Sequence, residues 1–241
     1  MGKTLSIAPK GKAKKARKRR SSWRDYGLAL TVAVGMALLL KALMIQAFRM
    51  PSRSMEDSLL VGDFLLVDKF TYGAPLPFIS LRLPALSNPQ IGDIVMFKYP
   101  PDPERLYIKR CIATGGQVVE VRNKVVYVDG SRAQDPPFSK YVDARIFSSS
   151  QNPRDNYGPQ RIPEDYLFVM GDNRDNSSDS RHWGLLPRDL VIGKALCIYW
   201  SCAPELQSGN GGIEASQAQF VDQVFRLPQR IRWSRLGYWV N

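Results

Sequence analysis

The sequence is poor in the residues that most often perform chemistry at neutral pH. Among 241 residues it has one histidine, His182, and three cysteines, Cys111, Cys197 and Cys202. These four residues lack the paired spacing of zinc ligands, so the sequence predicts no metal site. A conventional catalytic triad could use only His182 as its base. Any other nucleophile therefore needs a base of a different kind.

A disulfide between Cys197 and Cys202 conflicts with strand geometry. If the segment CIYWSC is one strand, five steps along it span about 16 Å. The Cα atoms of bridged cysteines lie within about 7 Å of each other. Only a turn inside the segment would allow the bond, and the redox state of all three cysteines stays open.

Acidic residues are missing from the first 24 positions, which hold ten of the 34 lysines and arginines. The net charge of +12 therefore falls to +2 (12 − 10) for the other 217 residues. Residues 10–20 show neither aromatic interleaving nor an apolar period. We predict a solvated basic tail over 1–24 and no nucleic-acid binding.

Residues 26–48 are almost free of charge, with Lys41 as the exception. A helix of this length rises about 34 Å, enough to cross a hydrocarbon core of about 30 Å. The alternative is a cleavable secretory signal, which the long basic region and the branched Ile45 near the end of the run disfavour. We predict a transmembrane helix over 25–48. The positive-inside rule then places residues 1–24 in the cytoplasm and 49–241 on the periplasmic or extracytoplasmic side, and Lys41 can extend toward the interface.

Beyond the apolar run, no long helical period appears. Short runs rich in branched and aromatic residues predict an all-β, mostly antiparallel domain. The predicted strands are 64–67, 94–99, 106–108, 118–121, 125–128, 166–170 and 195–200. Arg122-Asn123-Lys124 and Asp129-Gly130 are turn signals between and after VVEV and VVYV. Residues 131–160 and 203–219 are predicted loop insertions.

Two serines, Ser52 and Ser54, follow Pro51 where the apolar run ends. A lysine could activate one of them, but a free lysine is neutral in only about one molecule in 2,500 at pH 7. The pKa must fall by roughly 2 to 4 units, which burial in an apolar site can supply. Lys109 lies in an apolar strand, and strand alternation predicts that one of Lys109 and Arg110 is buried. Since arginine keeps its proton, Lys109 is the candidate base; the alternative is a strand end with two solvated cations.

The segment from Gly171 to Arg181 has no apolar side chain and directly follows the strand YLFVM. Its Asp and Arg residues alternate in sign, with Asn and Ser between them. Such a loop is either solvated or a rigid network of polar bonds that holds a site.

Together these segments resemble the type I signal peptidases, membrane-anchored Ser/Lys endopeptidases. The matching blocks frame nearly the whole extracytoplasmic part, and they are PSRSM (51–55), LLVGDFLLVDKF (59–70), GDIVMFKYP (92–100), YIKR (107–110), GDNRDNSSDSRHWG (171–184) and RIRWSRLG (230–237). The last block resembles the C-terminal strand of the family.

The resemblance implies that Ser54 is the nucleophile and Lys109 the general base, without a cofactor or metal. Ser52 would bind the oxyanion together with the backbone N–H of Ser54. The supporting residues would be Ser177, which orients the lysine amine, and the ion pairs Asp172–Arg110 and Asp179–Arg181. His182 would have no catalytic role.

The implied substrates are the signal peptides of exported preproteins, which carry small residues one and three positions before the cut. The implied partners are the lipid bilayer and a nearby secretion translocon. Two alternatives stay open: a processing peptidase for one secreted or pilus protein, and a non-catalytic membrane-anchored binding domain. One departure concerns Asp57, where the family usually has proline. We expect its turn to be less constrained, and we expect the carboxylates of Glu56 and Asp57 to point to solvent.

Overall fold

The computed structural model describes residues 23–73, 84–203 and 230–240. The chain divides into two units, Met1–Leu40 and Lys41–Asn241. Most of the predicted basic tail and nearly all of the predicted loop 203–219 lie outside the described residues. The predicted loop 131–160 is described in full.

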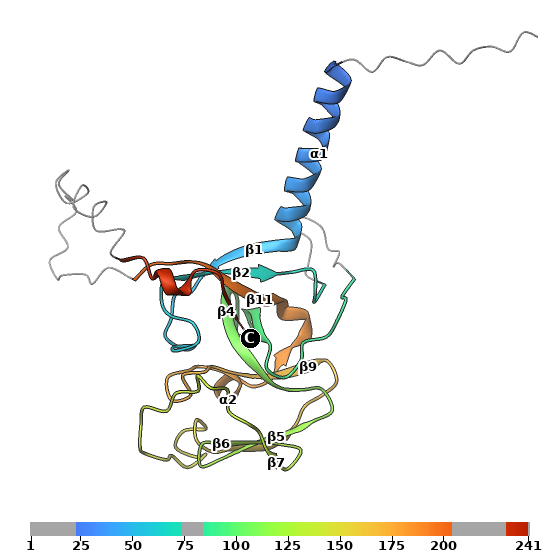
Figure 1. The fold of residues 1–241 in the computed structure, drawn as a ribbon. Coiled ribbons are helices and arrows are strands. Elements are labelled where there is room, and N and C mark those ends of the chain that lie inside the picture. Colours follow the sequence, from blue (N-terminus) through green and yellow to red (C-terminus); the bar gives the residue numbers. More distant parts are fainter. Residues whose placement is uncertain (1–22, 74–83, 204–229, 241) are drawn as a thin grey trace, which may run out of the picture. The chain divides into compact units, whose positions relative to one another are not determined.

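The apolar run begins as helix α1, Trp23–Met44 (Figure 1). Within the described ranges, no helix meets the length and apolarity needed to cross a membrane. The helix was predicted to continue to residue 48, and this boundary is wrong. Residues Ile45–Arg49 form strand β1, which pairs with β2 (Asp63–Asp68). The segment is apolar enough for either structure, and the hydrogen bonds offered by β2 favour the strand.

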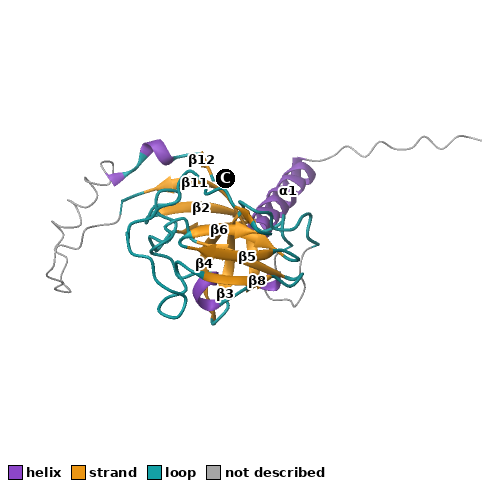
Figure 2. Ribbon diagram, turned by 90° about the horizontal axis from the view of Figure 1, so that it is seen from below, coloured by secondary structure: helices purple, strands orange, loops and turns teal. Residues whose placement is uncertain are grey.

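The second unit is built on two antiparallel sheets (Figure 2). The large sheet has the order β1-β2-β11-β3-β4-β9-β10, and β12 pairs with β11. Its remaining strands are β3 (Ile94–Tyr99), β4 (Asp102–Thr114), β9 (Tyr166–Met170), β10 (Leu186–Pro187), β11 (Val191–Ser201) and β12 (Tyr238–Trp239). The prediction of a mostly antiparallel β domain is confirmed.

The small sheet has the order β7-β6-β5-β8. Its strands are β5 (Val118–Arg122), β6 (Val125–Val128), β7 (Ser131–Arg132) and β8 (Tyr157–Arg161). Asn123 and Lys124 have φ of 49° and 71°, and Asp129 and Gly130 have φ of 51° and 77°. Paired left-handed residues are what a two-residue hairpin turn requires, so both predicted turns are confirmed.

Each predicted strand falls within an observed one, but several observed strands were not predicted. The block at 230–237 was expected to be a strand, and this is wrong. It contains the 3-10 turn Trp233–Arg235, and the strand β12 follows it. The three cysteines are unpaired, and β11 runs through Cys197 without reversing.

The hydrophobic core anchors the segment that carries the two serines. Met50, Met55 and Leu59 are buried in one cluster with side chains of β2, β3, β4 and β11. The backbone N–H of Met50 donates to the carbonyl of Asp63 at 2.8 Å. The buried residues thus fix the segment on the sheet, with Ser52 exposed and Ser54 largely buried.

Candidate active site

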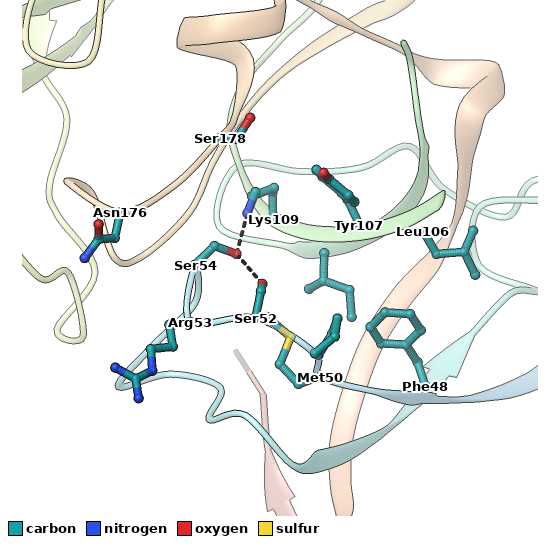
Figure 3. Close-up of a pocket in the computed structure, with 12 residues that line it drawn as sticks. Phe48, Met50, Ser52, Arg53, Ser54, Leu106, Tyr107, Lys109, Asn176 and Ser178 are labelled. Carbon is teal, nitrogen blue, oxygen red and sulfur yellow. Dashed lines mark hydrogen bonds between the residues drawn. The ribbon is translucent and has the colours of Figure 1, made fainter. Parts of the chain in front are cut away.

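Ser54 lies beside the amine of Lys109. Lys109 Nζ is 2.5 Å from Ser54 Oγ, and Ser52 Oγ is 3.2 Å from Ser54 Oγ (Figure 3). Ser54 comes from the turn after Pro51, whereas Lys109 comes from β4, 55 residues further along the chain. The structure therefore brings together three residues that the sequence singled out. A hydroxyl within hydrogen-bond distance of an amine is the geometry that proton transfer needs.

The Lys109 side chain is withdrawn from water, with a residue exposure of 3%. Burial lowers the pKa of its amine from 10.5 to about 8. The carboxylates of Asp179 and Asp172 raise the pKa of the amine, while the guanidinium of Arg181 lowers it. Desolvation outweighs these charges, so a useful fraction of the amine is neutral near pH 8.

Arg110 is also buried, which contradicts the expectation that only one of the two cations would be. Residues 108–113 of β4 are all buried because core clusters cover both faces of the sheet here. The guanidinium of Arg110 donates to both carboxylate oxygens of Asp172, at 2.9 and 2.8 Å, and to the carbonyl of Gly92 at 2.7 Å. Ser58 Oγ donates to Asp172 at 2.5 Å. A fully bonded ion pair of this kind can be buried without an unpaired charge.

Asp179 and Arg181 form a second buried ion pair, with N–O distances of 2.8 and 2.7 Å. Burial alone would raise the pKa of Asp179. The charge and hydrogen bonds of Arg181 have a larger, opposite effect, and the pKa falls to about 2. Asp179 also accepts a bond from the backbone N–H of Gly171 at 3.1 Å, and Arg181 donates to the carbonyl of Arg174 at 2.7 Å. These bonds close the polar segment 171–181 into a compact loop.

Ser177 is buried in this loop close to the Asp179 carboxylate, whose pKa its hydroxyl helps to lower, although the two groups do not form a hydrogen bond of standard geometry. The implied bond to the Lys109 amine is not formed in this structure. Close packing places Ser177 against Gly171, where an added Cβ atom would lie 2.3 Å from Ser177 Oγ and 2.4 Å from the carbonyl oxygen of Ser54. Only glycine lets the polar loop approach the turn that carries Ser54 this closely.

A cavity of about 260 Å³ opens beside Ser54. Figure 3 shows Phe48, Met50 and Leu106 on one side of the serine, with Arg53 and Asn176 on the other. The apolar side is suited to small apolar groups, and the polar side remains open to charged or hydrated ones.

The single histidine is not part of this arrangement. His182 lies in the short helix α2, Ser180–Trp183, where its side chain is exposed and does not line the cavity. A histidine-based triad at Ser54 therefore has no support in this geometry.

The turn after Ser54 differs from expectation. Asp57 has a φ of +80°, which proline cannot adopt, so the turn has its own backbone conformation rather than a looser version of a proline turn. Asp57 is half exposed, as expected, but Glu56 is only partly exposed and accepts a bond from Asn173 at 3.2 Å. Both carboxylates lie near Lys140, a residue that the sequence gave no reason to select.

A serine beside a buried lysine, held on an antiparallel β domain, defines a candidate serine hydrolase. Comparison with known proteins is more specific. The family model "Signal peptidase, peptidase S26" matches residues 23–200. The chain belongs to this family.

Individual relatives agree with the family assignment. The chain is 32% identical to signal peptidase I of Pseudomonas fluorescens, covering 75% of this chain and 73% of that protein. It is 33% identical to signal peptidase I of Aquifex aeolicus over 83% of this chain and 92% of that protein. It is also 38% identical to a probable signal peptidase I of Synechocystis, over 75% and 84% of the two chains.

Proposed function

We propose that this chain is a membrane-anchored serine endopeptidase that removes signal peptides from exported preproteins, with Ser54 as nucleophile and Lys109 as general base. One observation carries the proposal: an amine 2.5 Å from the serine hydroxyl, in a site where burial lowers its pKa to about 8. Membership of the signal peptidase family supplies the substrate class.

In the proposed reaction, neutral Lys109 accepts the Ser54 proton while Ser54 Oγ attacks the scissile carbonyl. The oxyanion accepts hydrogen bonds from the Ser52 hydroxyl and the Ser54 backbone N–H. Each such donor contributes about 3 kcal/mol to transition-state stabilisation in well-studied hydrolases. The ammonium then gives its proton to the departing amine and leaves an acyl-enzyme. Water, deprotonated by the same amine, hydrolyses the ester and restores both residues.

The ion pairs Arg110–Asp172 and Arg181–Asp179 keep this site rigid. They hold β4 and the polar loop in place around the amine, and each carboxylate is neutralised by its own arginine. The proposed role of Ser177 is to bond to the amine during the reaction, and its burial in the polar loop beside Asp179, which also acts on the charge of Lys109, supports this role.

The cavity supports a preference for small side chains before the cut. In an extended peptide, alternate residues point the same way, so residues one and three positions before the scissile bond face the same surface. Phe48, Met50, Leu106 and Ile108 make that surface apolar, which suits apolar side chains such as that of alanine.

The proposed partners also include the lipid bilayer and, near it, the secretion translocon. Helix α1 exposes apolar side chains such as Leu28, Leu30 and Val32, and its 22 residues rise about 33 Å. The second unit exposes Trp233 and Trp239, and tryptophan is enriched where proteins meet a membrane surface. In this proposal residues 1–24 lie in the cytoplasm and the β domain lies on the periplasmic or extracytoplasmic side.

Cleavage of a secreted precursor by the full-length chain in detergent tests the proposal. Ser54→Ala and Lys109→Ala should each abolish cleavage while circular dichroism and thermal unfolding remain those of a folded protein. His182→Ala is the matched control and should keep its activity. Undiminished processing by either active-site variant would refute the mechanism.

A further inference from the structure

Lys140 links the long loop 131–160 to the polar loop that holds the active site. Its backbone N–H donates to the carbonyl of Asp172 at 2.8 Å, and its carbonyl accepts from the N–H of Arg174 at 2.9 Å. These two bonds form an isolated parallel bridge between Lys140 and Asn173. The backbone of Lys140 is therefore fixed relative to Asp172, one of the buried acids beside the site.

The Lys140 side chain extends from this bridge to the turn that carries the nucleophile. Its ammonium nitrogen lies 3.4 Å from a carboxylate oxygen of Glu56 and 3.5 Å from one of Asp57. Asn173 adds two bonds to the same turn, from its amide to the carbonyl of Arg53 at 3.1 Å and from its backbone N–H to the carbonyl of Ser54 at 3.1 Å.

The turn itself needs such support. Asp57 has a φ of +80°, a conformation that costs non-glycine residues free energy. The carboxylate of Asp57 is also next to that of Glu56 in the sequence. Two adjacent negative charges repel each other, and Lys140 is the cation paired with both in the described part of the chain. Its charge therefore offsets the repulsion while its length fixes the distance between turn and loop.

The loop that presents Lys140 is held by its own network. Asp175 accepts bonds from Lys124 Nζ at 2.9 and 3.0 Å and from the backbone N–H groups of Val142 and Asp143 at 2.9 and 2.8 Å. Arg174 donates to Asp135 at 2.6 Å. Lys140 is thus presented from an ordered frame, and its own backbone is anchored to the loop it supports.

We propose that Lys140 is a positioning residue, which holds the Ser54 turn against the polar loop through the carboxylates of Glu56 and Asp57. This proposal rests on the proposed function of Ser54 and Lys109. Lys140 touches no reacting atom and does not line the cavity. Its loss should therefore misplace the nucleophile, which lowers kcat, and should leave the binding of peptide nearly unchanged.

Kinetics of the full-length chain with a fluorogenic peptide carrying alanine one and three positions before the cut test this role. Lys140→Ala should lower kcat about fivefold and change KM by less than about twofold. A 1 Å misplacement of a reacting group can lower the rate about 100-fold, so a fivefold loss corresponds to a smaller shift of the turn. Lys140→Arg should keep more than half of the activity. The double variant Glu56→Gln/Asp57→Asn removes both the ionic link and the repulsion between the two carboxylates. Its kcat should therefore fall at least twofold but less than that of Lys140→Ala, and adding Lys140→Ala to it should cause no further loss. Arg122→Ala, which removes an ion pair with Glu120 in the small sheet, is the matched control and should leave kcat unchanged.

Three results would overturn the inference: a kcat within twofold of wild type for Lys140→Ala, losses that multiply in the combined variant, or an arginine variant as impaired as the alanine one. If Lys140→Ala fails to fold, the variant Glu56→Gln/Asp57→Asn tests the inference instead, because it keeps the lysine and both side-chain volumes. A kcat equal to wild type in that variant would overturn the inference. Ser54→Ala separates the two proposals. Residual cleavage by that variant would disprove the proposed nucleophile, whatever the Lys140 variants do.

Discussion

Replacing Lys109 by methionine should make the protein more stable and inactive. Methionine has a similar length and carries no charge, so the substitution removes the cost of burying an ammonium. That cost follows from the pKa, which is 10.5 for a free lysine and about 8 in the folded chain. The difference of 2.5 units (10.5 − 8) corresponds to about 3 kcal/mol at pH 7, where both states are mostly protonated. Loss of the hydrogen bond with Ser54 destabilises the variant by about 1 kcal/mol, so we expect a net stabilisation of about 2 kcal/mol.

The sign of the pH dependence is specific. Between pH 8 and 10.5 the unfolded chain holds a proton on Lys109 that the folded chain has released, so wild-type stability rises with pH in this window. At pH 9.5 the burial cost falls to about 1.5 kcal/mol, and the advantage of Lys109→Met should shrink by about 2 kcal/mol. Urea unfolding followed by tryptophan fluorescence at pH 7 and 9.5 measures both values. Lys98→Met, at an exposed lysine of β3, controls for loss of a surface charge. A destabilised Lys109→Met variant, or an effect independent of pH, would refute the reasoning.

Three further substitutions have definite expected outcomes. Gly171→Ala should lower kcat for peptide cleavage by at least tenfold, because the new Cβ atom would lie 2.4 Å from the Ser54 carbonyl oxygen. Activity equal to wild type would mean that the polar loop does not contact the turn that carries Ser54. Asp57→Pro should impair cleavage and lower the melting temperature, because proline cannot adopt a φ of +80°; a fully active proline variant would show a different turn in solution. His182→Ala should keep kcat/KM within about twofold, since the exposed ring lies outside the cavity, and a large loss would assign the histidine a role.

Much of the fold follows from local sequence patterns. Branched and aromatic runs mark the central strands, and residues such as Asn123 and Gly130 mark the hairpin turns because they tolerate left-handed conformations. The start of β1 could not be located in this way. Ile45 to Phe48 continue an apolar run, and what makes them a strand is pairing with residues of β2 that lie 17 (65 − 48) to 23 (68 − 45) residues further along the chain.

The candidate site was predictable only in part, for two physical reasons. Chemistry singled out Lys109 as the candidate base, because arginine keeps its proton, and the resemblance to the signal peptidases selected Ser54 rather than Ser52 as its partner. The burial of Arg110 does not follow from strand alternation, because it depends on core clusters covering both faces of β4 and on Asp172 completing an ion pair. Lys140 lies in a segment without any period, and its position depends on contacts between loops distant in sequence.

The most direct test of the central claim is the dependence of kcat/KM on pH for the full-length chain in detergent. If neutral Lys109 activates Ser54, activity should rise with pH as the amine loses its proton, with a midpoint near 8. At pH 7 about one amine in ten would be neutral, compared with about one in 2,500 for an unperturbed lysine. A midpoint near the free-lysine value of 10.5, or activity that does not rise with pH, would contradict the account.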